Sequence, residues 1–159
     1  LPDEALPDGL RFALVSREEV AASPDETVSR CAWYAGAEAQ GFALMHGTRI
    51  VCLQWIWYGA RYGREAFWAI GSNEAVSMHI VTVPDQRARG HATHLKRHSA
   101  RFMRSRGYVA LWSRVWWTNR PSLRVNRKAG WRRVGTIFSY RTPWGKSRQT
   151  WHRVHRLWA

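Results

Sequence analysis

The alternation of hydrophobic and polar residues divides the first half of this chain into short strands. Two apolar runs, residues 41–46 and 49–58, flank Gly47-Thr48 and predict a β-hairpin. The second run is apolar on both faces, which is typical of a strand in the middle of a sheet. We expect an earlier strand at residues 10–15, followed by a short helix that begins at the capping-box pattern Ser16-Arg17-Glu18-Glu19 and ends at Ala22.

The pattern changes to a strand followed by a helix in the second half. Residues 78–83 form an apolar run that Pro84 ends, and a helical period follows from Ala92 to a stop at Gly107. The residues that recur at helical spacing on one side of this helix are Ala92, Leu95, Ser99, Phe102 and Met103. The residues that we expect to face solvent are Lys96, Arg97, Arg101 and Arg104.

The remaining pattern predicts a strand at 108–115, a short helix between Pro121 and Gly130, and a hairpin of residues 131–141 and 150–158 around 143–146. Residues 59–73 are rich in glycine and aromatic side chains, and we expect a covering loop there. This order predicts an α/β fold with a mixed sheet. We expect residues 1–9 to be a flexible acidic arm and residues 10–159 to be one domain.

Composition limits the classes of function. The net charge is +14, with −4 in residues 1–30 and +18 in the rest, so a polyanion or a phosphorylated cofactor is a suitable partner. No apolar stretch reaches the ~18 residues of a membrane span, and the two cysteines are expected to be buried thiols in a cytoplasmic protein. We expect the eleven tryptophans to serve the core more than base stacking.

The segment Arg87-Ala88-Arg89-Gly90-His91-Ala92 connects the strand at 78–83 to the helix after it. A glycine-containing turn at a helix N-terminus presents unpaired backbone N–H groups and the positive end of the helix dipole. Two arginines add positive charge to the same turn. The sequence therefore predicts an anion site that suits a pyrophosphate.

Two motifs together resemble the GCN5-related N-acetyltransferase family. The family's phosphate-binding motif is Gln or Arg, two residues, Gly, one residue, then Gly or Ala, as in Arg87–Ala92. Its second motif is matched by Asn119 and Ser122 and by Lys128-Ala129-Gly130-Trp131. The resemblance covers roughly residues 76–140 and implies a mixed, mostly antiparallel sheet flanked by helices, with two strands that splay apart around acyl-CoA.

The resemblance also implies a set of cofactor-binding residues. Acetyl-CoA, or another acyl-CoA, would lie between the strands at 78–83 and 108–115 as a co-substrate, and no metal is implied. The residues expected to bind it are Ile80, Val81, Thr82, Arg87, Ala88, Arg89, Gly90, His91, Ala92, Thr93, Asn119 and Asn126.

The catalytic residues depart from the family pattern. Members transfer an acetyl group directly to an amine, with a base for the amine and often a tyrosine as acid. That tyrosine position is Asn126 here, and a carboxylate position of some members is Arg114. Our candidate catalytic residues are therefore His79 as base, because its pKa of ~6.5 suits the task, and Asn126 as a hydrogen-bonding group. Further candidates are Glu74 as base and Tyr34, Tyr58 and Tyr140 as acids.

The acceptor is expected to be a primary amine bound by the strand 50–58 and the loop 59–73. Arg61, Arg64 and Arg114 favour an anionic small molecule, a sugar or an RNA-linked amine, and a homodimer is also considered. His91, His94 and His98 share a helical face, which we interpret as a solvated basic face and not as a metal site. The alternative function is a basic nucleic-acid-binding module on the same fold with weak or lost catalysis.

Overall fold

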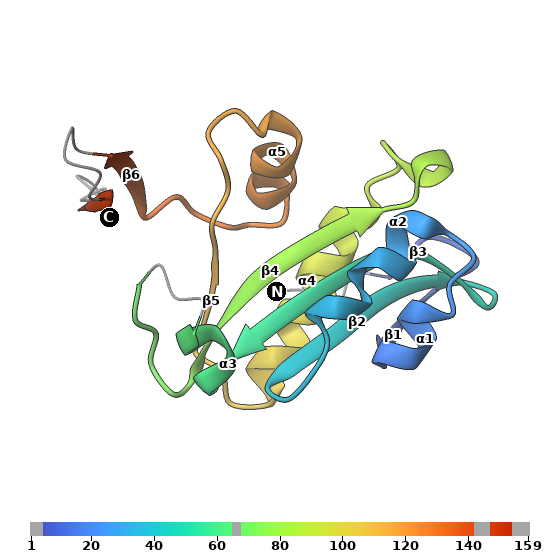
Figure 1. Cartoon of the computed structure of the whole chain (residues 1–159). Helices are drawn as coiled ribbons and strands as arrows, with labels where there is room; N and C mark the ends of the chain where they lie inside the picture. Colours follow the sequence, from blue (N-terminus) through green and yellow to red (C-terminus); the bar gives the residue numbers. More distant parts are fainter. Residues whose placement is uncertain (1–4, 65–67, 142–146, 154–159) are drawn as a thin grey trace. The chain divides into compact units, whose positions relative to one another are not determined.

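The computed structural model describes residues 5–64, 68–141 and 147–153 (Figure 1). The chain divides into two compact units, Leu1–Ala129 and Gly130–Ala159, which are described separately below. No helix among the described residues is long and apolar enough to cross a membrane.

The first unit is built on a five-stranded sheet in the order β1-β2-β3-β4-β5. Its first four strands pair antiparallel and β4 pairs with β5 in parallel, which confirms the predicted mixed, mostly antiparallel sheet. The bounds are β1 Leu10–Val15, β2 Ala39–His46, β3 Arg49–Tyr58, β4 Glu74–Thr82 and β5 Ala110–Ser113. β3 is buried from Ile50 to Trp57, because strands and helices cover it from all sides, as its apolar pattern predicts.

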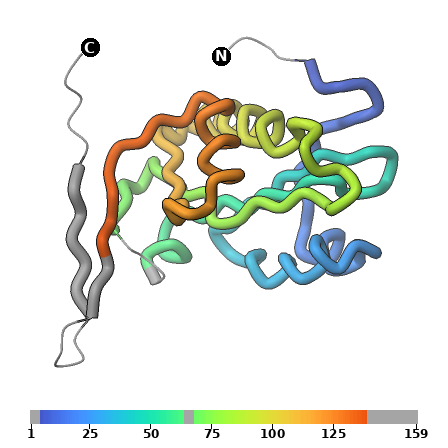
Figure 2. The backbone as a smooth tube through the Cα atoms, turned by 90° about the horizontal axis from the view of Figure 1, so that it is seen from above, coloured from blue at the N-terminus to red at the C-terminus, as the bar shows by residue number. Residues whose placement is uncertain are grey.

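Helices cover both faces of this sheet (Figures 1 and 2). α1 Arg17–Ala21, α2 Glu26–Ser29 and the 3-10 helix η1 Arg30–Tyr34 lie on one face, and α4 His91–Ser105 lies on the other. The capping box of Ser16 and Glu19 is present at the start of α1. α2 and η1 were not predicted; the Asp25 side chain starts α2 by accepting a hydrogen bond from the Thr27 amide at 2.9 Å.

Three sequence predictions need correction. Lys96 was expected to face solvent, but its side chain is 2% exposed because α4 turns it toward the sheet. Residues 59–64 form helix α3 Gly59–Arg64, where a loop was expected. The predicted strand 108–115 is shorter, since only Ala110–Ser113 pairs with β4.

The core of the first unit lies between the sheet and its helices. Trp55, Phe42 and Leu44 fill it from the strands, and Leu95 and Met103 reach it from α4. Cys31 and Cys52 are both buried thiols, as expected. Among the tryptophans, Trp55 and Trp57 are buried, which confirms a packing role for those two.

The second unit is a β-hairpin in the part that the structure describes. β6 Gly135–Arg141 pairs antiparallel with β7 Ser147–Arg153, from Gly135 opposite Arg153 to Arg141 opposite Ser147. The predicted C-terminal hairpin is therefore confirmed, with its second strand three residues earlier than expected. The predicted connection at 143–146 lies outside the described residues.

Candidate functional site

Strands β4 and β5 stop pairing at one defined point. Their parallel register runs from Glu74 opposite Ala110 to Ser77 opposite Ser113 and stops there. β4 continues to Thr82, so its last five residues have no strand partner on the β5 side within the described residues. Backbone N–H and C=O groups that lack a strand partner can pair with an extended ligand. This is the splayed geometry implied for an acyl-CoA cleft.

A β-bulge lies at the same point of β4. Trp55 of β3 pairs with His79 and Ile56 pairs with Ser77, so Met78 is an additional residue in the ladder. A bulge breaks the alternation of side chains and re-aims those beside it. Ser77 therefore points toward α4, while His79 points toward η1 on the opposite face.

A buried polar cluster surrounds Ser77 on the α4 face. The Ser77 hydroxyl accepts hydrogen bonds from Gln54 Nε2 at 3.0 Å and from Lys96 Nζ at 3.3 Å. Ser99 Oγ donates to Gln54 Oε1 at 2.8 Å. Burial lowers the pKa of Lys96 to about 8, and the Cys52 thiol that faces it has a pKa raised to about 12 by burial.

The predicted anion site follows β4 directly. After the 3-10 helix η2 Pro84–Gln86, the chain passes through Arg87 to Gly90 and enters α4. Gly90 is the N-cap of α4 with φ +85°, and Ala88 also has a positive φ of 64°. Arg87 Nε donates to the Thr82 carbonyl at 3.3 Å, which ties the turn to the end of β4. Arg87, Ala88, Arg89 and Gly90 are exposed, so an anion can approach the helix N-terminus.

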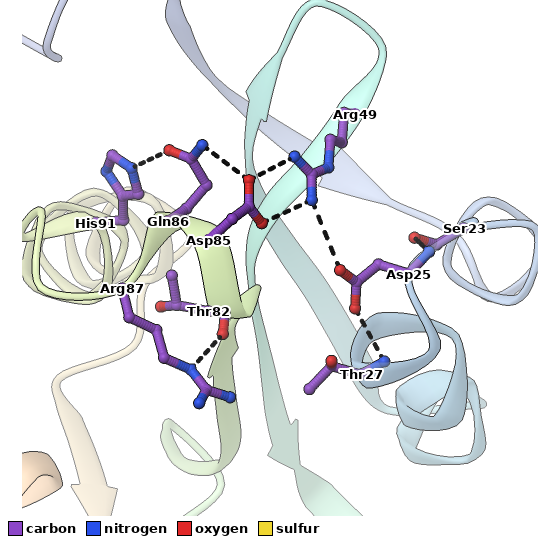
Figure 3. A network of polar contacts seen from close by, with 9 residues as sticks. All are labelled: Ser23, Asp25, Thr27, Arg49, Thr82, Asp85, Gln86, Arg87 and His91. Carbon is purple, nitrogen blue, oxygen red and sulfur yellow. Dashed lines mark hydrogen bonds and ion pairs between the residues drawn. The ribbon is translucent and has the colours of Figure 1, made fainter.

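A polar network holds this turn in place (Figure 3). Arg49 makes a bidentate pair with Asp85, with both N–O distances at 2.8 Å, and also lies 3.7 Å from Asp25. Gln86 bridges Asp85 at 3.1 Å to His91 at 3.4 Å. Arg49 lowers the pKa of Asp85 to about 2, and the same guanidinium neutralises the one carboxylate beside the anion site.

The other predicted cofactor residues lie on β4, α4 and α5. Ile80, Val81 and Thr82 are half-buried on the diverging part of β4, and His91, Ala92 and Thr93 form the first turn of α4. On α5 Arg120–Lys128, which packs on α4, Asn126 has a buried side-chain oxygen with no hydrogen-bond partner. Asn119 caps α5 by accepting from the Ser122 amide at 3.2 Å. An unsatisfied buried amide suits an amide-rich ligand such as pantetheine.

A pocket of about 380 Å³ lies on the α2 face of the sheet. Its lining comes from α2, η1 and β4: Glu26, Thr27, Arg30, Cys31, Trp33, Tyr34, His79 and Val81. The predicted acceptor wall of strand 50–58 and loop 59–73 does not line this pocket, and Trp55 and Trp57 of that strand are buried. The signal that was missed is Asp25-Glu26, which caps and charges the first turn of α2.

The pocket joins a candidate base to a candidate acid. The Tyr34 ring stacks on the His79 imidazole with 4.7 Å between centroids. Burial lowers the pKa of His79, so its imidazole is neutral and can take a proton near neutral pH. Burial raises the pKa of Tyr34, so its phenol keeps its proton.

Arg61 holds the pocket wall instead of facing an acceptor. Its guanidinium donates to the carbonyls of Tyr34 at 2.9 Å and Ala35 at 2.8 Å and lies 4.3 Å from the Trp57 ring centroid. Trp57 Nε1 donates to the same Tyr34 carbonyl at 2.7 Å. The expectation that Arg61 binds an anionic acceptor stays a prediction, and in the structure its guanidinium is bonded to these backbone carbonyls. Arg114 is exposed and lies 5.4 Å from the Trp116 ring centroid, while the side chain of Arg64 is outside the described part.

The remaining candidates lie elsewhere. Glu74 accepts from the Gly71 amide and from Trp112 Nε1 at the far end of β4, and Tyr58 packs on Tyr108. The Tyr140 side chain falls outside the described residues. The helical histidines do not form a solvated face as expected, because His91 is buried and His98 packs on Phe12.

Comparisons with known proteins agree with this geometry at the level of the fold. No protein-family profile and no curated sequence matches the chain. Solved structures do match, at low identity, and three of them are described here. Aminoglycoside N-acetyltransferase AAC(6')-Iy with a bisubstrate analogue is 16% identical, with TM-score 0.63, over 84% of this chain and 97% of that one. AAC(6')-Ih from Acinetobacter baumannii is 13% identical, with TM-score 0.60, over 84% and 98%.

A ribosomal-protein-alanine N-acetyltransferase from Brucella melitensis is 12% identical, with TM-score 0.55, over 76% of this chain and 89% of that one. These neighbours act on different acceptors, so the likeness concerns the scaffold they share. The mixed, mostly antiparallel sheet of five strands flanked by helices agrees with that scaffold. The chain therefore has the fold of the GCN5-related N-acetyltransferases.

Proposed function

We propose that this protein is an acyl-CoA-dependent N-acyltransferase that moves an acetyl group from acetyl-CoA to a primary amine. The observation that carries the proposal is the position of the anion-binding turn, directly after the strand that diverges from β5. A single ligand with a pyrophosphate at one end and an amide-containing arm matches both features. Acetyl-CoA has this form and supplies a thioester that an amine can attack.

The cofactor residues follow from this placement. Arg87, Arg89 and the backbone of Gly90 to Thr93 would hold the pyrophosphate, and the free edge of Ile80–Thr82 would pair with the pantetheine arm. The unpartnered amide oxygen of Asn126 would accept a hydrogen bond from the same arm. These residues orient the thioester but transfer no proton.

His79 serves as the general base in this proposal. It lies in the pocket beside the divergence point, and its lowered pKa keeps it able to accept the amine proton. A neutral amine then forms the new N–C bond while the C–S bond breaks. Holding both reactants in one pocket contributes through orientation.

Ser77 with Lys96 serves as the proton source for the leaving thiolate. The bulge places Ser77 on the face opposite His79, so a thioester held between β4 and β5 would meet the base from one face of the sheet and Ser77 from the other. Sulfur takes the hydroxyl proton of Ser77, and the Lys96 ammonium, 3.3 Å away, returns a proton to the oxygen. This pair would fill the role that the family tyrosine has where this chain carries Asn126.

Thiol release tests the function directly. The purified chain is mixed with acetyl-CoA or longer acyl-CoA donors and with a panel of amines: an aminoglycoside, an amino sugar, an amino acid and a peptide. We expect thiol release that requires both an amine and the protein, and that falls in His79→Gln. Absence of amine-dependent thiol release with every donor and acceptor would contradict the enzyme assignment.

A further inference from the structure

Charge is distributed along this chain in a way that one bound CoA does not account for. Asp85 is the last carboxylate of the sequence, and the 74 residues after it carry 19 of the 25 lysines and arginines. Twelve of these bases lie between Gln86 and Ala129, in the first unit. Unbalanced charge of this density repels itself and favours a polyanion partner.

The positive charge is concentrated on α5 and the adjoining end of α4. α5 has nine residues, of which Arg120, Arg124, Arg127 and Lys128 are exposed. Arg97 of α4 donates to the carbonyl of Lys128 at 2.6 Å, which joins the two helices into one surface. We call these residues and the loop 114–119 the basic surface.

Exposed aromatic side chains lie on the same surface. Trp116 is 68% exposed and Trp117 is 81% exposed in the loop between β5 and α5. The loop is ordered by a hydrogen bond from the Asn119 amide to the Trp116 carbonyl at 2.9 Å, and Arg114 lies over the Trp116 ring. Indole rings held in solvent next to guanidinium groups are suited to stacking unpaired bases.

We infer that the basic surface binds single-stranded nucleic acid, with Arg124 and Arg127 on phosphates and Trp116 and Trp117 stacked on bases. Arginine outnumbers lysine there by ten to two among the bases from Gln86 to Ala129. Planar guanidinium groups bind phosphate through two donors and also stack, which favours nucleic acid over a simple anionic lipid layer. Single strands are favoured over duplexes because their bases are free to stack on indole.

Fluorescence anisotropy of the full chain with a labelled oligouridine of about 16 nucleotides tests this inference. We expect the oligonucleotide to bind, and the logarithm of its binding constant to fall linearly with the logarithm of salt concentration. Arg124→Glu with Arg127→Glu should reduce the slope by about 1.4 and weaken binding about 25-fold or more at 0.1 M salt, since each lost phosphate contact contributes about 0.7 to a single-strand slope. The control is Arg11→Glu with Arg17→Glu, which makes the same charge change at two exposed arginines outside the surface and should leave the slope unchanged.

Stacking is tested by Trp117→Ala, which should weaken binding, against Trp33→Ala, which removes an indole that is 62% exposed elsewhere and should not. The inference is overturned by no binding, by equal losses in both charge variants, by displacement of the oligonucleotide with excess CoA, or by binding to phosphatidylserine vesicles alone. These measurements contain no acyl donor, so they are independent of the proposed transferase activity. Nucleic-acid binding can be absent while thiol release is observed, and thiol release can be absent while nucleic acid binds.

Discussion

Ser77 and His79 are two residues apart on β4, yet their side chains face opposite sides of the sheet. The bulge at Met78 causes this, because it shifts the pairing from Ile56 with Ser77 to Trp55 with His79. Ser77 takes a hydrogen bond from Lys96 of α4, and His79 stacks on Tyr34 of η1. In an unbulged strand the two side chains would share one face. One strand therefore presents Ser77 and His79, the proposed proton source and the proposed base, on opposite faces of the sheet.

Replacing His79 tests the base. His79→Gln should lower kcat by about 10² to 10⁴ and leave acetyl-CoA affinity unchanged, because a positioned general base contributes that much to the rate. Since burial lowers the pKa of His79, the acidic limb of the wild-type kcat/KM profile should have its midpoint below pH 6.5. His46→Ala, at an exposed histidine, is the control. An unchanged kcat in His79→Gln would exclude the imidazole as base.

Replacing Lys96 tests the proton source. The pKa of Lys96 is about 8, so wild-type kcat should decline as pH rises through that value and the ammonium is lost. Lys96→Met and Ser77→Ala should lower kcat more than they change KM, and both should remove this alkaline limb. A limb that persists in both variants would contradict the role of the pair.

The pH dependence of the free energy of unfolding gives an independent test of the pKa of Lys96. Its pKa falls from 10.5 in the unfolded chain to about 8 in the fold, so the unfolded state binds more protons between these values and stability from this group rises with pH. The free energy of unfolding of wild type relative to Lys96→Met should increase by ~3 kcal/mol from pH 7 to pH 10.5. Cys52, which faces Lys96, has a pKa of about 12 and remains a thiol through most of this window. A flat difference would show that Lys96 is not buried as a cation.

The pair of Arg49 and Asp85 should control the charge of the anion site. Arg49→Met leaves the Asp85 carboxylate without its bidentate partner beside the turn, and acetyl-CoA affinity should fall by about fivefold, or about 1 kcal/mol of Coulomb repulsion. Adding Asp85→Asn should restore the affinity. Isothermal titration calorimetry of the single and double variants measures both steps, and a double variant as weak as Arg49→Met would contradict the electrostatic explanation.

Arg61 should affect the acceptor and leave the donor alone. It clamps the carbonyls of Tyr34 and Ala35 and covers the Trp57 ring, so Arg61→Ala loosens the wall that carries Tyr34. We expect a higher KM for the amine with an unchanged Kd for acetyl-CoA. A parallel loss of both affinities would indicate general unfolding instead, which circular dichroism would detect.

The sequence was sufficient to predict the sheet and the turn into α4. Apolar alternation marked β1 to β4, and Gly90 before a helical period marked the turn into α4, because both signals are local. The bulge at Met78 was not predictable, since it depends on how β4 pairs with β3. The burial of Lys96 was also missed, because its partners Ser77 and Gln54 lie on other elements.

The pocket between α2, η1 and β4 was not predicted, for a related reason. The tryptophans of β3 suggested a binding wall, but the side chains of Trp55 and Trp57 are buried in packing. The lining comes from Glu26 to Tyr34, a segment whose helices are four and five residues long and so carry little periodicity. Capping by Asp25 was the one local signal there.

Thermal unfolding with and without acetyl-CoA tests the central claim most directly. A ligand that binds only the folded state stabilises it, by about 2.7 kcal/mol at a hundred times its Kd. Gly90→Glu places a side chain and a negative charge in the proposed anion site. Gly90 has φ +85°, a backbone conformation that L-residues adopt at a cost. We predict a rise in Tm for wild type and none for Gly90→Glu, whereas an unchanged wild-type Tm at saturating acetyl-CoA would contradict the account.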